Sequence, residues 1–240
     1  SVSEEGTPRI WTCQSVPERN VRTLANAHDK LIFQIDFDRE GKRLLSGSFD
    51  GTARVWDLDD HRLIATYQDH SAPLVAVDFN FDGSRAASLD ADGVLHVWDP
   101  VTGKPIFHID PQSNRFPQLI REACGRIIGD LLFFPGVLST GLFTPDGAGV
   151  VKFQNDSMKV FRADDGTPVV SLAGAADHGW PVFSHDSTLV AILEMNRKLP
   201  RVWDLRTGQL VGSQASQVSH AKGLGMVTFS PVDSRMVACD

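Results

Sequence analysis

The stretches "SGSFDGTARVWDL" (residues 46–58) and "SLDADGVLHVWDP" (residues 88–100) decide the fold, because they spell one pattern twice with an offset of 42 residues. The offset returns later in the chain, where Phe161 aligns with Trp203. A recurrence of this length indicates one structural unit that is built several times. The first two units share these identical pairs: His28 and His70, Asp36 and Asp78, Phe37 and Phe79, Gly41 and Gly83, Ser46 and Ser88, Asp50 and Asp92, and Trp56 and Trp98.

Each repeat contains four short runs in which apolar and polar residues alternate, as in residues 31–37, 42–48, 52–58 and 62–68. Turn-forming clusters separate these runs, and sustained helical periodicity occurs only within residues 115–134. The pattern predicts four strands that pair as an antiparallel sheet. Such a sheet is apolar on both faces and must be buried against its neighbours. Radial stacking of these sheets predicts an all-β fold, a β-propeller.

Composition excludes several classes of protein. The chain has 240 residues, of which 42% are hydrophobic, so it is long and apolar enough for a real core. A net charge of −7 argues against a nucleic-acid partner. The most apolar stretch (126–138) is interrupted by Gly, Asp and Pro, which argues against a membrane span. Three widely spaced cysteines favour neither a disulfide framework nor a zinc site, and we expect a cytoplasmic protein: Cys13, Cys124 and Cys239.

The repeat resembles the WD-repeat β-propeller family, in its bacterial type. The shared features are a His before the first strand, a Ser in the second, an Asp-Gly turn and a Trp-Asp pair that ends the third strand. The resemblance implies that His, Ser, Asp and Trp form a hydrogen-bonded tetrad inside each blade. It also implies that a kinase or nucleoside-triphosphatase domain is fused to the repeats. The expected structural tetrads are His28, Ser46, Asp50 and Trp56, then His70, Ser88, Asp92 and Trp98.

The repeats divide the chain into about five blade equivalents, of which only two carry a complete tetrad. A later blade has Phe161 in place of Trp, and another has Leu193 at the Ser position. The chain is either a fragment of a larger ring, seven-bladed by resemblance, or a closed five-bladed ring. The predicted division is a partial blade (1–30), two blades (31–70 and 71–110), an insertion (111–136), two blades (137–176 and 177–218) and a second partial blade (219–240).

No pattern for catalysis, a cofactor or a metal ion stands out. The Asp-rich turn at residues 90–93 lacks the later Glu of a calcium loop. Residues 102–107 are similar to a turn of quinoprotein propellers, which keeps a propeller-hosted enzyme, quinoprotein-like or a hydrolase with a site in the central channel, as the alternative. However, Trp98 precedes this turn instead of following it, and the predicted innermost strands offer only Asp36 and Asp78.

We therefore predict a non-catalytic scaffold that binds a protein or peptide through loops on one face of the propeller, with neither a nucleic-acid nor a membrane partner. The insertion lies at the same end as the Asp-Gly turns, the end that this family commonly uses for partners. Its apolar residues recur at helical spacing, so it forms either a helix packed on the ring or part of an exposed patch. The candidate partner-binding residues are Phe49, Phe116, Leu119, Ile120 and Trp180.

Overall fold

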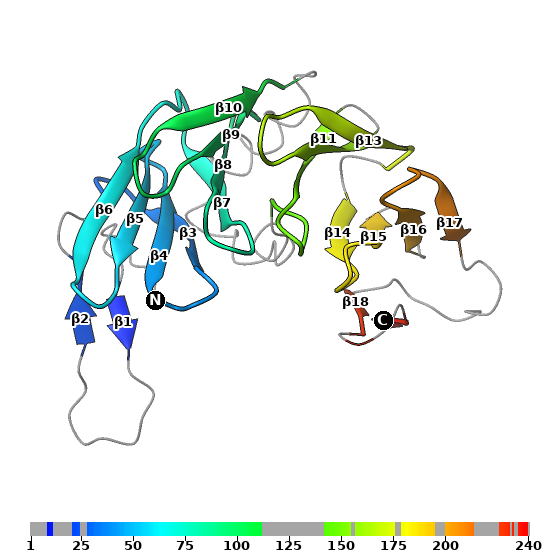
Figure 1. Ribbon diagram of the computed structural model, residues 1–240, viewed down its shortest axis with the longest axis horizontal. Helices are drawn as coiled ribbons and strands as arrows, with labels where there is room; N and C mark the ends of the chain where they lie inside the picture. The colour runs from blue at the N-terminus through cyan, green and yellow to red at the C-terminus, as the bar shows by residue number, and fades with distance from the viewer. Residues whose placement is uncertain are drawn as a thin grey trace. The chain divides into compact units, whose positions relative to one another are not determined.

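In the computed structural model, every described element is a β-strand (Figure 1). The structure describes residues 9–11, 21–24, 28–111, 142–154, 157–175, 179–194, 200–213, 226–230, 232 and 235–239. The chain forms two compact units, one mainly of residues 1–110 and one mainly of residues 122–240. A search of the described residues for helices long and apolar enough to cross a membrane finds none.

The first unit contains two four-stranded antiparallel sheets in which the strands pair in chain order (Figure 1). The two sheets have the same register, because Ser46 pairs with Arg54 in one and Ser88 with His96 in the other. The prediction of four-stranded antiparallel blades is thereby confirmed. The strands are β1 (Arg9–Trp11) and β2 (Val21–Thr23), which pair with each other, then β3 (Ile32–Phe37), β4 (Arg43–Ser48), β5 (Ala53–Asp57) and β6 (Arg62–Tyr67), then β7 (Leu74–Phe79), β8 (Ala86–Asp90), β9 (Leu95–Trp98) and β10 (Pro105–Ile109).

The second unit repeats the same plan. It has a sheet of three strands, to which Phe143 adds one bridge with Val150, then a sheet of four strands and a final pair. Most of the predicted insertion (111–136), and most of the first strand expected in blade 137–176, lie outside the described residues. The strands are β11 (Gly149–Gln154), β12 (Ser157–Arg162) and β13 (Pro168–Ala173), then β14 (Gly179–Phe183), β15 (Leu189–Glu194), β16 (Arg201–Asp204) and β17 (Leu210–Ser213), then β18 (Met226–Phe229) and β19 (Met236–Cys239).

The two ends of each blade have different turns. The turn between the second and third strands carries Asp-Gly in the first two blades, and we call this the Asp-Gly end. The turns between the first and second strands and between the third and fourth strands lie at the opposite end. We call it the Phe end because a Phe stands there in five blades: Phe37, Phe79, Phe143, Phe183 and Phe229. The residue after this Phe receives a backbone hydrogen bond from the start of the second strand in four blades, although its identity changes: Asp38, Asn80, Thr144 and Ser184.

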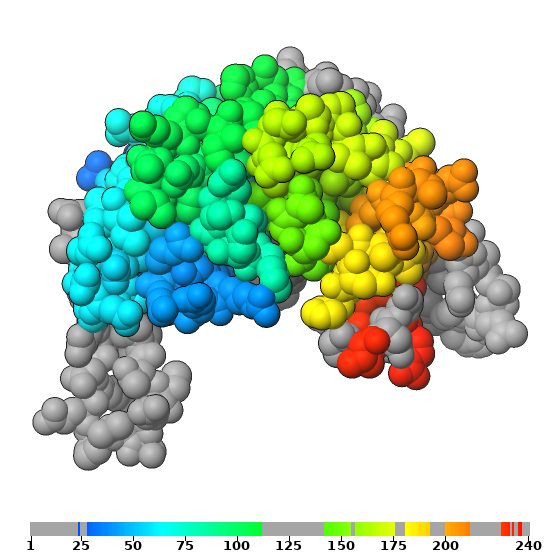
Figure 2. All heavy atoms as spheres, viewed as in Figure 1, coloured from blue at the N-terminus to red at the C-terminus, as the bar shows by residue number. Residues whose placement is uncertain are grey.

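The first two blades are joined by apolar packing and by hydrogen bonds between their first strands. Their shared core includes Leu45, Tyr67 and Trp98, all nearly or fully buried. Strands β3 and β7 also meet, because Gln34 Oε1 accepts from Val77 N at 3.2 Å and Asp36 Oδ2 accepts from Phe79 N at 2.8 Å. In Figure 2 the atoms of the two blades lie directly against each other. Side chains thus supply the hydrogen bonds that strand pairing cannot make between blades.

The second unit has a core of the same kind between its three-stranded and four-stranded sheets. It combines Met158 and Leu172 of the first sheet with Ile192 and Trp203 of the second. All four side chains are essentially inaccessible to solvent. Packing of this density between blades follows from the two-sided apolar pattern of the strands.

We predict that Gly47→Ala destabilises the first unit, because a Cβ atom at Gly47 would lie 2.5 Å from Cγ1 of Val77 in the next blade. Overpacking of this kind costs about 1–3 kcal/mol. Urea denaturation of Gly47→Ala, Val77→Ala and the double variant measures the contact. Because Val77→Ala removes the clash, the double variant should lose less stability than the sum of the single losses. Strict additivity would contradict the close approach of the two blades.

Candidate functional site

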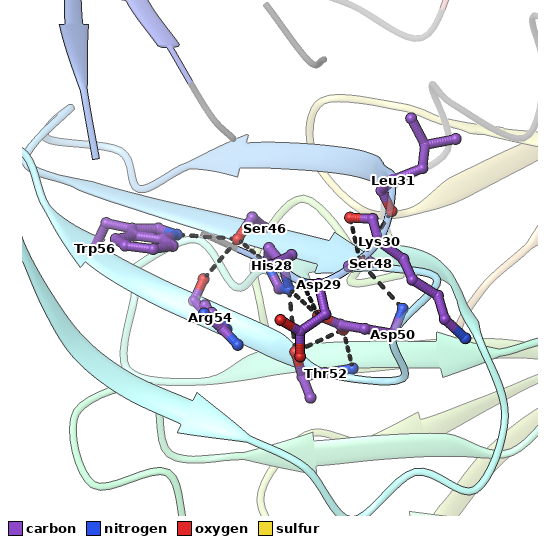
Figure 3. A network of polar contacts seen from close by, with 10 residues as sticks. All are labelled: His28, Asp29, Lys30, Leu31, Ser46, Ser48, Asp50, Thr52, Arg54 and Trp56. Carbon is purple, nitrogen blue, oxygen red and sulfur yellow. Dashed lines mark hydrogen bonds and ion pairs between the residues drawn. The ribbon is translucent and has the colours of Figure 1, made fainter. Parts of the chain in front are cut away.

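The first tetrad forms one continuous chain of hydrogen bonds inside its blade (Figure 3). Trp56 Nε1 donates to Ser46 Oγ at 3.0 Å, and Ser46 Oγ lies 2.8 Å from His28 Nε2. His28 Nδ1 then lies 2.9 Å from Asp50 Oδ2. All donors are satisfied when neutral His28 carries its hydrogen on Nδ1 and accepts the Ser46 hydrogen on Nε2. Burial lowers the pKa of His28, which agrees with the neutral form. These contacts join the four side chains that the resemblance implies for this tetrad.

Asp50 connects the tetrad to the Asp-Gly turn. Its Oδ1 accepts from the backbone N and the hydroxyl of Thr52, at 2.8 and 2.7 Å. Burial raises the pKa of Asp50, but the hydrogen bonds from Thr52 and the contact with His28 outweigh it and leave the pKa below its usual value. Ser48 completes the turn, because its Oγ donates to Leu31 O and accepts from Asp50 N (Figure 3). The carboxylate therefore fixes both the His and the turn.

The second tetrad has the same bonds but a different carboxylate. Trp98 Nε1 donates to Ser88 Oγ at 3.2 Å, and His70 Nε2 lies 2.7 Å from Ser88 Oγ. His70 Nδ1 lies 2.9 Å from Oδ2 of Asp90, which is 1% exposed. The predicted assignment of Asp92 to this tetrad is therefore wrong.

The turn residues explain the exchange of Asp92 for Asp90. Asp90 stands where the first blade has Ser48, and its Oδ1 accepts from Asp92 N at 3.0 Å and Val94 N at 2.8 Å. It thus combines the two functions that Ser48 and Asp50 divide in the first blade. Val94 stands where the first blade has Thr52, so a carboxylate at Asp92 has no hydroxyl donor of that kind. The replacement of Thr by Val is the signal in the sequence that indicates the exchange.

Both tetrads fall within matches to a known family. The family model "WD domain, G-beta repeat" matches residues 18–57 and 61–99, which contain the two sets of hydrogen-bonded side chains. The chain therefore contains two WD repeats. Its four-stranded antiparallel sheets are the blades of a WD-repeat propeller, and how many blades complete the ring stays a prediction.

Two curated proteins show the same relationship over short segments. The chain is 34% identical over 91 residues to "WD40 repeat-containing protein HOS15" of Arabidopsis thaliana, which is 31% of this chain and 14% of that protein. It is 42% identical over 55 residues to "Protein transport protein SEC13" of Candida albicans, which is 22% of this chain and 18% of that protein. The WD-repeat chain therefore spans less than one fifth of the length of each relative.

The second tetrad extends into a cluster of aromatic and imidazole rings that sequence reasoning missed. Tyr67 of the first blade stacks on Trp98, with ring centroids 4.9 Å apart, and its hydroxyl lies 2.6 Å from His96 Nδ1. The His96 ring is 4.2 Å from that of His70 and 5.5 Å from that of His108. Burial, with the charges of these two neighbours, lowers the pKa of His96 to about 4. At neutral pH His96 is therefore an uncharged acceptor for the Tyr67 hydroxyl.

The sequence carries a signal for this cluster at the position two residues before the aromatic residue of the third strand. The other blades have Arg54, Lys159 and Arg201 there, and only this blade has a His. Arg201 shows what a permanent cation does at this position. Its guanidinium lies 4.7 Å from the Trp203 ring centroid and donates to Gly174 O at 2.6 Å. His96 replaces that cation with a group that is neutral at pH 7.

In the second unit, the aromatic residues near the ends of the third strands are buried. Phe161, which replaces the tetrad Trp, is 7% exposed, and Trp203 is 1% exposed within the apolar core. His178 and His220, which the repeat aligns with the tetrad histidines, lie outside the described residues.

Asp36 and Asp78, the carboxylates of the predicted innermost strands, join blades. Asp36 accepts from Phe37 N as well as from Phe79 N. Burial raises the pKa of Asp36, and hydrogen bonds from these two amides and from Asp78 partly offset the rise. Among the residues that the structure describes, no group of three or more His, Cys, Asp or Glu side chains is placed to hold a metal ion.

Of the five predicted partner-binding residues, Phe49 is the one whose side chain the structure describes. It is half-buried and stacks on Phe33, with centroids 5.4 Å apart. Trp180 contributes its backbone to β14. Phe116, Leu119 and Ile120 lie outside the described residues. The predicted patch therefore stays a prediction.

Within each unit, the exposed large apolar side chains that the structure describes lie at the Phe ends of their own blades, which sequence reasoning did not single out. In the described part of the chain, every large apolar residue that is strongly exposed lies in a turn of this end or in the adjoining strand positions. They come from both units, and their exposed fractions are Phe37 51%, Phe81 47%, Val101 60%, Val169 59%, Leu210 44%, Val211 62% and Val232 84%.

We predict that Asp90→Ala costs about 1–3 kcal/mol of stability, because it leaves His70 Nδ1 buried without its partner. The matched variant Asp92→Ala should cost clearly less, although the repeat alignment assigns Asp92 to the tetrad. Chemical denaturation followed by tryptophan fluorescence measures both losses. A larger loss for Asp92→Ala would contradict the assignment of Asp90.

We predict that the protein loses stability as the pH falls from about 6.5 to about 4. In this window the unfolded chain protonates His96 and the folded chain does not, so the unfolded state binds more protons and acid favours unfolding. The slope from this group is at most about 1.4 kcal/mol per pH unit. His28, whose pKa is also lowered, acts in the same direction.

The variant His96→Asn isolates the contribution of His96. The Asn carbonyl still accepts the Tyr67 hydroxyl hydrogen but does not titrate, so urea midpoints should depend less on pH in this window than they do in the wild type. His185→Gln, on an exposed turn of the second unit, serves as the control. Parallel pH profiles for His96→Asn and the wild type would show that His96 does not carry the effect.

Proposed function

We propose that this WD-repeat protein is a non-catalytic scaffold that binds other proteins through loops on one face of its blades. The observation that carries the proposal is the gathering of exposed apolar side chains at the Phe end of the described blades. Solitary exposed apolar residues are ordinary, but their concentration at one end indicates a surface that a partner covers. The names of the relatives, a WD40 repeat-containing protein and a protein transport protein, agree with such a role.

The rigid framework of the blades supports this proposal. The tetrads and the inter-blade cores fix the strands, and capped turns fix the loops that join them. Asp38, for example, accepts from the backbone N of Lys42 and of Arg43 at 2.8 and 3.0 Å. A surface that is already ordered loses little conformational entropy when it binds, so a modest contact area gives useful affinity. We place this function in the cytoplasm, in keeping with three cysteines that form no recognisable framework.

Amine-reactive cross-linking in cells, followed by mass spectrometry, tests the proposed function. Lys42 and Lys104 are exposed at the Phe end of the first two blades, whereas Lys30 is exposed near the Asp-Gly end. We expect reproducible cross-links from Lys42 and Lys104 to a protein partner, with few from Lys30. The absence of any reproducible protein partner would overturn the scaffold proposal. Cross-links from Lys30 alone would move the interaction to the Asp-Gly end.

A further inference from the structure

An arginine and a phenylalanine from neighbouring blades are stacked at the Phe end. The Cζ atom of Arg39, in the β3–β4 turn, lies 4.0 Å from the ring centroid of Phe81, in the β7–β8 turn. Phe81 is nevertheless 47% exposed. The two residues occupy the same position of the repeat, so the stack is a contact between equivalent turns of adjacent blades.

The turns that carry this stack are tied together. Arg43 bonds to Asp38 in its own turn, with Nε 2.9 Å from Oδ2, and its NH2 group donates to Gly83 O of the next turn at 2.8 Å. Gly83 has a φ of +67°, and a Cβ atom there would lie 2.3 Å from that NH2 group. The bond therefore depends on glycine at this position. Arg39 and Phe81 are thus presented by two turns with fixed positions.

Many of the carboxylates at this end are already used by the turns. Asp82 accepts from Ser84 N, and Asp99 accepts from Val101 N and Thr102 N. Hydrogen bonds with the Ser84 side chain and backbone lower the pKa of Asp82. Asp57 accepts two backbone amides in the same way, and Glu40 pairs with Lys42 at 2.8 Å.

Arg39, by contrast, has no ion-pair partner among the residues that the structure describes. Its guanidinium lies over the Phe81 ring, so the stack occupies a face of the group. In a cation–π stack of this kind the N–H donors at the edge of the guanidinium remain able to bind a carboxylate in a bidentate manner. The surface therefore offers a cation next to exposed apolar side chains.

Val101 extends the apolar part of this surface, whereas Phe37 belongs to a different one. Val101 is 60% exposed in the β9–β10 turn of the same blade, and the charge of Arg85 acts on a carboxylate of each of the two turns, Asp82 and Asp99. Phe37 is 51% exposed, but Phe79 at the same repeat position is 6% exposed and packs in the inter-blade core. Phe37 therefore lies on the face of its blade that, in the next blade, makes the inter-blade contact.

We propose that Arg39, Phe81 and Val101 form a docking surface for an acidic peptide segment, a proposal that rests on the scaffold function. The carboxylate of the segment pairs with the edge of the Arg39 guanidinium. A large apolar side chain next to that carboxylate lies on Phe81 and Val101. Charge complementarity selects this class of partner, because Arg39 has no ion-pair partner among the described residues while neighbouring carboxylates are bonded within their turns.

Selection from a phage-displayed library of random short peptides on the immobilised full chain tests the surface. We expect enrichment of sequences with Asp or Glu next to a large apolar residue. The binding of one enriched peptide, labelled with a fluorophore, is then measured by anisotropy. Because bidentate bonds to a carboxylate are strong, Arg39→Gln should weaken binding by about tenfold or more. Arg39→Lys, which keeps the charge but loses the planar fork, should fall between Arg39→Gln and the wild type.

Two further variants locate the binding site. Phe81→Ala should also weaken binding by about tenfold, because it removes both the apolar contact and the ring that holds Arg39. Phe49→Ala tests the competing patch predicted at the Asp-Gly end, and it should leave the affinity for this peptide unchanged. The tryptophan emission of each variant checks its fold, since Trp56 and Trp98 are fully buried.

Three results would overturn the docking surface. These are a library that yields no enriched acidic peptide, an affinity that is unchanged in Arg39→Gln and Phe81→Ala, and a loss of binding confined to Phe49→Ala. None of them removes the scaffold function if a protein partner still cross-links to the chain in cells. The reverse pattern, acidic peptides that need Arg39 but no partner in cells, would support the surface and leave the scaffold function without a partner.

Discussion

The structure depends on one requirement: a buried indole N–H, a buried imidazole and a buried carboxylate must all be satisfied inside a single sheet. Trp56, Ser46, His28 and Asp50 meet it as a chain in which each group donates to the next. Each unsatisfied member would cost about 1–3 kcal/mol. These hydrogen bonds run from Trp56 in the third strand through Ser46 in the second strand to His28 in the loop before the first. They therefore fix three segments of the blade at once. The turns of the blade are well ordered because these segments are fixed.

The resemblance to the WD-repeat family implied this network, and hydrogen-bonding chemistry restricts which residues can stand at each point of it. The 42-residue offset and the apolar–polar alternation predicted four strands per blade, whereas the partners of His28 were implied by the resemblance to WD-repeat proteins. That resemblance was not sufficient for Asp90, because the turn of the second blade holds two carboxylates two residues apart. The choice between them depends on Val94, which offers a backbone amide but no hydroxyl. An alignment of the repeats pairs residues by position. The choice of the carboxylate that bonds to His70 depends instead on the donor groups that a neighbouring residue, Val94, offers.

The surface was harder to predict for the same reason. Phe37 and Phe79 occupy the same position, yet one is 51% exposed and the other 6%. Arg39 and Phe81 also share a position, and they contact each other because equivalent turns of neighbouring blades are adjacent. The exposed fraction of a side chain depends on the neighbouring blade as well as on the residue itself. The sequence of a single repeat therefore does not predict it. The sequences of two neighbouring repeats, taken together, predict side-chain exposure better.

We propose that recognition lies where a repeat departs from its neighbours. Residues that the first two blades share serve the common network and are buried by it, as Ser46 and Ser88 are. Residues that differ between blades are free of that requirement, and two of them, Arg39 and Phe81, stack across a blade boundary at the Phe end. His96 is a third departure, at a position where other blades have a cation, and it meets Tyr67 across the same boundary. The boundary between the first two blades thus combines a framework that both blades share with side chains that differ between them.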